Sequence, residues 1–154
     1  MNYVYENFWK DWSNITLSAN VINAIPNIKN KRYLELGVYD GATFRDILSI
    51  DKTSVDIKRH PNFIELDYEL STDIFFSLTK EKVWDVIYID ANHDYEYVLR
   101  DYNNAIKHLC PNGSIIIHDM VPPSEEYTST HLCSDSYKLL YYIMENKSPN
   151  MLYY

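Results

Sequence analysis

The chain has 154 residues, of which 46% are hydrophobic and 23% are charged, so a single globular domain with one buried core is expected. Fourteen basic and twenty-two acidic residues give a net charge of −8, which argues against a nucleic-acid-binding surface. The sequence has no apolar run near the ~18 residues of a membrane span, and its N-terminus carries acids and aromatics where a signal peptide needs a basic start. Its two cysteines, Cys110 and Cys133, lack metal-ligand spacing. We therefore expect a cytoplasmic protein without nucleic-acid or membrane partners.

The first half of the chain predicts helices alternating with short strands. Apolar residues at helical spacing over 3–25 predict an amphipathic helix within residues 1–28, ahead of an α/β unit over 29–154. Then follow a strand at 33–36, a glycine turn, a helix at 42–50, strands at 53–57 and 63–66, and a helix after its capping residue Ser71. Residues 58–62 are too few for a helical crossover of about a dozen residues. Either the third segment is not a regular parallel strand, or the crossover is reduced to a turn.

The second half predicts two fully buried strands. The apolar runs at 83–89 and 114–117 are separated by a helix at 95–109 and a turn at 111–113, and a helix at 136–145 and a β-prone segment at 151–154 follow. Strands that alternate with helices predict a doubly wound, Rossmann-like α/β fold with a parallel sheet. The sequence offers little to cover the edge of the strand at 114–117, and this predicts either a homo-oligomer or a chain that is part of a longer one.

Two of the three glycines in the chain lie four residues apart in one loop. We expect Gly37 to let the backbone turn against a ligand and Gly41 to let the next helix begin close to the strand. Glu35 precedes this loop and could hold the cationic amino-acid end of a ligand. The dinucleotide fingerprint G-x-G-x-x-G is absent. The alternative is a plain strand-to-helix turn that uses glycine for its geometry.

An acid also ends the next predicted strand. A carboxylate at Asp56 could accept hydrogen bonds from both ribose hydroxyls of a nucleoside cofactor. The alternative is a solvated acid in a turn.

Two further acids, Asp90 and Asp119, follow the two buried strands, which we expect to be neighbours. Like charges so close need a cation or a proton between them, and His93 and His118 stand beside them in the sequence. The four side chains are therefore candidates for a divalent metal site or for a general base. The alternative is that His93 and Asp94 only cap the helix that begins at Tyr95.

These motifs resemble class I S-adenosylmethionine-dependent methyltransferases, and more narrowly the methyltransferase family 24 group. The resemblance covers about residues 30–145 and rests on segments 35–43, 55–56, 71–76, 85–95, 109–113, 118–119 and 122–123. Its most specific part is Asp90, His93, Tyr95 and Asp101 together with the distal His118-Asp119 pair.

The resemblance implies a three-layer sandwich whose sixth and seventh strands are short or missing here, since the chain stops at Tyr154. It implies S-adenosylmethionine as cofactor, with Mg²⁺ as an optional second one. The residues implied to bind S-adenosylmethionine are Glu35, Gly37, Tyr39 and Gly41 at the methionine end, Asp56 at the ribose, Asp67, Ser71 and Thr72 near the adenine, and Asp90. The implied catalytic residues are Asp90, His93 and His118, and the implied metal ligands are Asp90 and Asp119.

The function expected from these residues is methyl transfer to a hydroxyl group of a small molecule or a sugar, which segments 1–28 and 120–135 would contact. One alternative is a non-catalytic module that binds S-adenosylmethionine or a partner. Another is a hydroxylase-like or lyase use of the same scaffold, because a fold does not fix a function.

Overall fold

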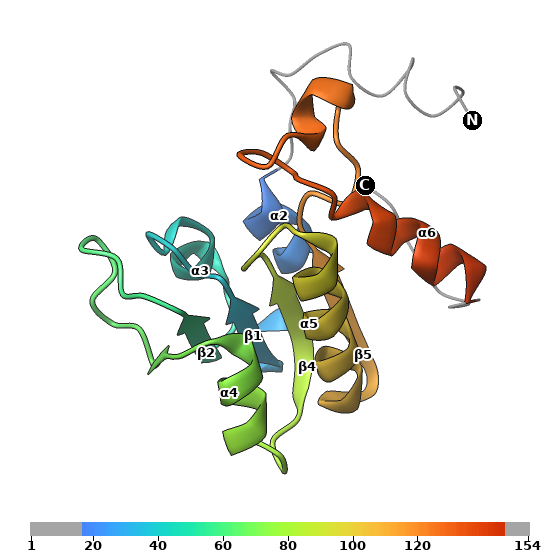
Figure 1. Cartoon of the computed structure of the whole chain (residues 1–154). Coiled ribbons are helices and arrows are strands. Elements are labelled where there is room, and N and C mark those ends of the chain that lie inside the picture. The colour runs from blue at the N-terminus through green and yellow to red at the C-terminus, as the bar shows by residue number, and fades with distance from the viewer. Residues whose placement is uncertain (1–16, 147–154) are drawn as a thin grey trace.

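The computed structural model describes residues 17–146 (Figure 1). Its strands are β1 (Arg32–Leu36), β2 (Asp51–Asp56), β3 (Tyr68–Glu69), β4 (Trp84–Ile89) and β5 (Leu109–Ile117). Its α-helices are α2 (Ser18–Asn23), α3 (Ala42–Asp46), α4 (Thr72–Leu78), α5 (Tyr95–Lys107) and α6 (Tyr137–Glu145), and short 3₁₀ turns lie at Ile28–Asn30 and Glu125–Thr128.

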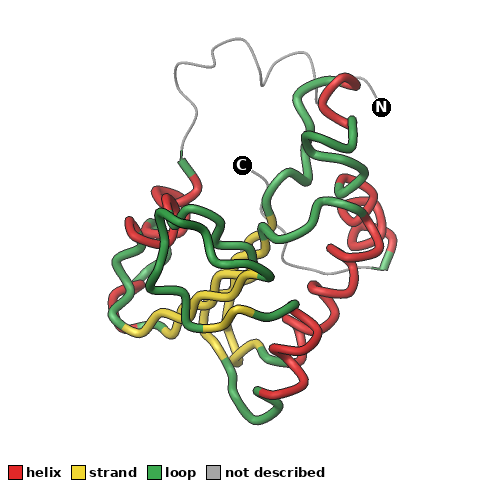
Figure 2. The backbone as a smooth tube through the Cα atoms, turned by 60° about the vertical axis from the view of Figure 1, so that its left-hand side comes forward, coloured by secondary structure: helices red, strands yellow, loops and turns green. Residues whose placement is uncertain are grey.

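The five strands form one parallel sheet in the order β3-β2-β1-β4-β5. Helices cover both faces, so the fold is the predicted Rossmann-like α/β sandwich (Figures 1 and 2). One face of the sheet packs with residues of α2 and α3, and the other with residues of α4 and α5. In the central pair of strands, Leu36 of β1 lies opposite Ile89 of β4, so the loops that follow the two strands begin side by side.

The segment between β2 and β4 differs from the sequence-based prediction. Residues 63–66 do not form a strand, although Phe63 and Leu66 are buried in the core, and β3 is a two-residue strand at Tyr68–Glu69. The chain between β2 and β3 contains no helix. Both departures have the same cause, which is the short length of chain between β2 and β3. About eleven residues cannot include a helix and still return to a parallel register.

Helix α3 ends at Asp46, earlier than the predicted end at residue 50. The backbone of Ile47 is extended, and the side-chain amide of Asn23 bridges the departing chain: its carbonyl accepts from the Leu48 amide, and its NH₂ donates to the Asp46 carbonyl. A side chain of α2 therefore supplies hydrogen bonds that another helical turn would have made.

Strand β5 begins at Leu109 and runs through the predicted turn at 111–113. The turn residues form an irregularity in the β4–β5 pairing, where Asn112 adopts a positive φ of 63°. No strand follows β5 within residues 17–146, and no helix of that range is long and apolar enough to cross a membrane. The segments predicted at 3–16 and 151–154 lie outside the described residues, and homo-oligomer formation stays a prediction.

Candidate functional site

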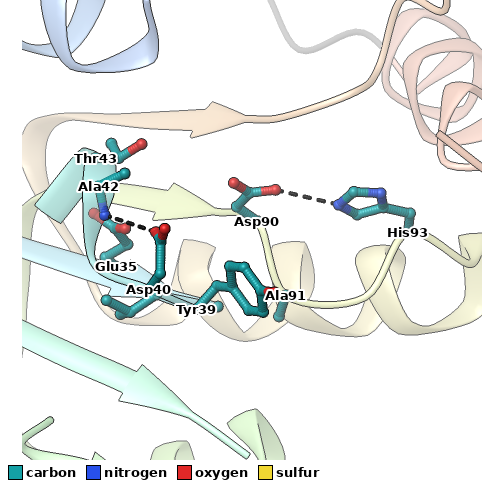
Figure 3. A pocket seen from close by; sticks show the side chains of 10 residues that line it. Glu35, Tyr39, Asp40, Ala42, Thr43, Asp90, Ala91 and His93 are labelled. Carbon is teal, nitrogen blue, oxygen red and sulfur yellow. Dashed lines mark hydrogen bonds and ion pairs between the residues drawn. The ribbon is translucent and has the colours of Figure 1, made fainter. Parts of the chain in front are cut away.

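A cavity of about 350 Å³ lies where the loops after β1 and β4 meet. Figure 3 shows it between the glycine loop, α3 and the chain that leads to α5. A volume of this size is within the range of small-ligand sites, about 300–1,000 Å³. Its lining brings together residues from both loops: Glu35, Gly37, Val38, Tyr39, Asp40, Ala42, Thr43, Asp90, Ala91 and His93.

Glu35 contributes a buried carboxyl group to this cavity, with 1% of the residue exposed. Burial raises its pKa to about 8, and the nearby Asp90 adds to the rise, while a hydrogen bond from the Tyr33 hydroxyl and the charge of Lys52 oppose it. A cationic ligand group would favour the ionised form, since an opposite charge lowers the pKa of a carboxyl. Glu35 is therefore suited to hold an ammonium group.

The two glycines of the loop have different neighbours. Gly37 has a φ of +85°, and a Cβ there would lie 2.2 Å from the carbonyl oxygen of Asp90, so the close approach is to the backbone after β4. Gly41 has a φ of +79°, and a Cβ there would lie 2.1 Å from the ring of Phe63. Gly37 lines the cavity, where it was expected to turn the backbone against a ligand, and the neighbouring strand end also requires a glycine at this position.

Asp56 fixes the shape of the glycine loop from the end of β2. Its carboxylate accepts hydrogen bonds from the backbone amides of Tyr39, at 2.8 Å, and Lys58, at 3.2 Å. Tyr39 has a positive φ of 48° and its ring packs against His60 with the centroids 4.6 Å apart. Asp56 lies next to the cavity without lining it.

The three residues expected near the adenine are held by the fold. The Asp67 carboxylate accepts from both the backbone amide and the hydroxyl of Ser54, at 2.8 and 2.7 Å. Ser71 caps α4, as predicted, by accepting from the Ile74 amide at 3.4 Å. Thr72 hydrogen-bonds the buried carboxyl of Asp101. None of these side chains lines the 350 Å³ cavity.

Asp90, Asp119, His93 and His118 form one cluster at the ends of β4 and β5. Asp90 Oδ1 lies 3.2 Å from Nε2 of His93 and 3.2 Å from Nδ1 of His118. The Asp119 oxygens lie 3.2 Å from Nδ1 of each histidine. Figure 3 shows the Asp90–His93 contact at the edge of the cavity. The two acids expected to share a site therefore contact the same two imidazoles.

The contacts within this cluster lower the pKa of its two acids and raise the pKa of its two histidines. The two imidazoles hold the pKa of Asp90 and of Asp119 below the usual range despite burial. In turn, contact with the two carboxylates overcomes the effect of burial on His118 and raises its pKa to about 10, and the hydrogen bond to Asp90 raises the pKa of His93. The raised pKa of His118 favours its protonated form, whose positive charge lies beside the two carboxylates.

The donor atoms also fit a metal ion. Asp90, His93 and His118 offer one carboxylate oxygen and two ring nitrogens within 4.8 Å of one another. Ligands about 2.1 Å from one ion lie about 3.0–3.4 Å apart at octahedral or tetrahedral angles, which matches both 3.2 Å separations from Asp90. Nδ1 of His93 lies 2.9 Å from the Leu132 carbonyl, an arrangement that leaves Nε2 as the ligand atom. Two imidazoles favour zinc or iron over Mg²⁺.

Helix capping does not account for His93 and Asp94. Asp94 is the N-cap residue of α5, but its side chain makes no capping hydrogen bond. Instead, the Tyr95 amide donates to Asp135 at 2.6 Å, and the Asp94 carboxylate accepts from Ser134 at 2.7 Å. The chain after β5 therefore supplies the cap, and His93 is directed toward Asp90 and Asp119.

Sequence reasoning missed Tyr88, which supports the cluster from β4. The Tyr88 hydroxyl lies 3.2 Å from Asp90 Oδ2 and 3.1 Å from the hydroxyl of Ser18 on α2. Since side chains alternate along a strand, a tyrosine two residues before a strand-end acid lies on the same face. The spacing Tyr-x-Asp here and Tyr-x-Glu at Tyr33–Glu35 was the signal that could have identified both tyrosines.

Comparison with known proteins agrees with this geometry. No curated protein matches the chain. Residues 34–120, more than half of the sequence, match the family model described as a methyltransferase domain, family 24. The matched range begins in β1 and ends just after Asp119, so it includes the cavity and the Asp–His cluster. The chain therefore belongs to this methyltransferase-domain family.

Proposed function

We propose that the protein transfers a methyl group from S-adenosylmethionine to a hydroxyl group of a small molecule or a sugar. The observation that carries the proposal is the cavity in which the buried Glu35 and the Asp90–His93 pair face the same space. The family match supports a methyltransferase, and a cofactor with a cationic amino-acid end and a sulfonium centre suits a site with two carboxyl groups.

In this proposal the two ends of the cavity have different tasks. Glu35 receives the ammonium group of the cofactor, and the glycine loop supplies backbone contacts. Asp90 places negative charge beside the sulfonium methyl. The remaining assigned residues, Asp56, Asp67, Ser71 and Thr72, shape the nucleoside side of the site, where their hydrogen bonds fix β2 and the start of α4.

The acceptor hydroxyl approaches from the Asp–His cluster. His93 borders the cavity. In its neutral form, with Nδ1–H donating to the Leu132 carbonyl, Nε2 takes the hydroxyl proton as the oxygen attacks the methyl carbon in line with the departing sulfur, and the imidazolium that results is stabilised by Asp90. His118, held as a cation between Asp90 and Asp119, stabilises the negative charge that develops on the oxygen. Most of the rate enhancement then comes from positioning and charge.

A divalent cation held by Asp90, His93 and His118, with Asp119 beside them, would instead lower the pKa of the acceptor hydroxyl. In that state the chain's own contribution is the orientation of the ligands: Leu132 fixes the His93 ring through Nδ1, and Tyr88 holds the second oxygen of Asp90.

The proposal is tested with thermal shifts and calorimetry using S-adenosylmethionine, S-adenosylhomocysteine, NAD and ATP. A ligand that binds only the native state stabilises it by mass action, so the two sulfur nucleosides should raise the melting temperature and NAD should not. Stabilisation by NAD alone would contradict the proposal. Cofactor binding without transfer of a labelled methyl group to any acceptor would support the non-catalytic alternative.

A further inference from the structure

A second cavity, of about 360 Å³, also borders His93. It is lined by Ala91, Asn92, His93, Asp94, Thr130, His131 and Leu132. Ala91 and His93 also line the first cavity, so the two spaces adjoin at these residues. A transferase must bring two substrates together at one reacting centre, and adjoining cavities that share a proposed base meet this requirement.

The chain that continues from the lining residues 130–132 is attached to the ends of β4 and β5 by four hydrogen bonds. The segment 132–136 contacts the chain after β4 through the Leu132 carbonyl with His93, the Ser134 hydroxyl with Asp94, and the Asp135 carboxylate with the Tyr95 amide. The fourth bond runs from the Ser136 hydroxyl to the Asp119 carbonyl at 2.7 Å.

Ser134 and Ser136 are buried, and Ser134 adopts a positive φ of 49°. The chain directly after the lining residue Leu132 is therefore held in place, in part by His93 and Asp119 of the Asp–His cluster.

The residues that line the second cavity favour some classes of methyl acceptor over others. Asn92, Thr130 and His131 provide hydrogen-bonding groups, Asp94 provides a carboxylate, and Leu132 an apolar surface. Alternating polar and apolar contacts suit a compound with several hydroxyl groups on a carbon ring. The negative charge of Asp94 disfavours phosphorylated or carboxylated acceptors.

We propose that this second cavity is the acceptor site and that it binds an uncharged polyhydroxylated ring, a glycosyl unit, with one hydroxyl directed past His93 into the first cavity. The inference rests on the proposed methyl transfer. It assigns acceptor recognition to residues 91–94 and 130–132.

The test separates acceptor binding from cofactor binding. The full chain is loaded with S-adenosylhomocysteine, whose affinity is measured by calorimetry. Methyl α-glucoside, methyl α-mannoside, methyl α-rhamnoside and myo-inositol are then examined one at a time by saturation-transfer NMR. Glucose 6-phosphate and catechol serve as charged and aromatic comparisons. At least one uncharged glycoside should give a signal, and glucose 6-phosphate should give none.

Two variants locate the binding. Thr130→Trp places an indole in the second cavity and should abolish the glycoside signal, whereas Ser129→Trp, at an exposed neighbour outside the lining, should retain it. His131→Ala should weaken glycoside binding by about two- to tenfold, the effect of losing one hydrogen bond. All three should bind S-adenosylhomocysteine with the affinity of the parent chain.

The inference is overturned if S-adenosylhomocysteine binds and no glycoside does, or if only glucose 6-phosphate or catechol binds. It is also overturned if Thr130→Trp leaves the glycoside signal unchanged. If S-adenosylhomocysteine itself does not bind, the result contradicts the proposed methyl transfer, on which this inference rests.

Discussion

The hydroxyl group of Tyr33 donates a hydrogen bond of 2.5 Å to the carboxylate of Glu35, two residues further along β1. Both side chains are almost fully buried, and the bond lowers the pKa of Glu35 against the larger effect of burial. The carboxyl group therefore titrates at about pH 8, close to the conditions of an ordinary binding experiment.

Cofactor affinity should depend on pH through Glu35. If the ionised Glu35 carboxylate binds the ammonium group, the affinity for S-adenosylhomocysteine rises as the pH increases toward 8. The rise should be about tenfold between pH 6 and 7, because the fraction of molecules with an ionised Glu35 rises in that proportion. Calorimetry across pH 6–8.5 measures this dependence. Binding at pH 7 should also release a proton, seen as a heat that varies with the ionisation enthalpy of the buffer.

Two variants identify the titrating group. Glu35→Gln should bind more weakly and lose the pH dependence, and Tyr33→Phe should move the curve to higher pH because it removes the bond that lowers the pKa of Glu35. A parent chain whose affinity is constant from pH 6 to 8.5 would show that Glu35 does not receive the ammonium group.

The same carboxyl group should affect stability in the absence of ligand. Its pKa is about 8 in the folded chain and near its ordinary value of 4.5 when unfolded, so between these values the native state binds more protons. The free energy of unfolding should therefore fall as pH rises from 4.5 to 8, with a contribution from this group of at most about 1.4 kcal/mol per pH unit. Urea titrations at several pH values give the unfolding free energy of the parent chain and of Glu35→Gln. The difference between the slopes of this free energy against pH is the contribution of Glu35. Parallel slopes would contradict the assignment.

Gly37→Ala should destabilise the fold. The added Cβ would meet the backbone of Asp90 and Ala91, and φ is positive, so neither a side-chain rotation nor a small backbone shift relieves the contact. We expect a loss of more than about 2 kcal/mol in chemical denaturation. Gly41→Ala is the matched comparison, since its Cβ would meet the Phe63 side chain, and it should cost less. A Gly37→Ala chain that is as stable as the parent and fails only to bind ligand would show that the fold does not need this glycine.

The sequence predicted the sheet, the strand-end acids and the proximity of the two histidines to them, because apolar runs and parallel topology determine where strand ends meet. It did not predict β3 at Tyr68–Glu69, since two paired residues leave no periodic pattern. Nor did it predict that Asp135, forty residues after Tyr95, provides the cap of α5. Such contacts depend on how loops pack across the sheet, for which a single sequence has no local signal.

Metal binding should favour ions that accept imidazole ligands. Zn²⁺ or Co²⁺ should raise the melting temperature more than Mg²⁺ at equal concentration, because two of the three donors are ring nitrogens. Binding should release protons, since His118 must lose its proton to become a ligand. His118→Ala should reduce the effect of Zn²⁺ strongly, whereas His131→Ala, outside the donor group, should not. A larger shift with Mg²⁺ would favour the oxygen-rich pair Asp90 and Asp119 as ligands instead.

Asp90→Asn should separate catalysis from cofactor binding. The substitution keeps the size of the side chain but removes the charge that both imidazoles contact at 3.2 Å, and it leaves Glu35 and the glycine loop in place. We expect turnover to fall by about 100-fold or more, because His93 loses the carboxylate that supports it as a general base. The affinity for S-adenosylhomocysteine should stay within about threefold of the parent value, under 1 kcal/mol. Tyr88→Phe removes only the hydroxyl that contacts the other oxygen of Asp90, so it should reduce turnover less and leave cofactor affinity unchanged.

Steady-state methyl transfer and calorimetry on the parent chain, Asp90→Asn and Tyr88→Phe provide the comparison. If Asp90→Asn lost cofactor affinity as strongly as turnover, Asp90 would be a cofactor ligand rather than part of the catalytic cluster.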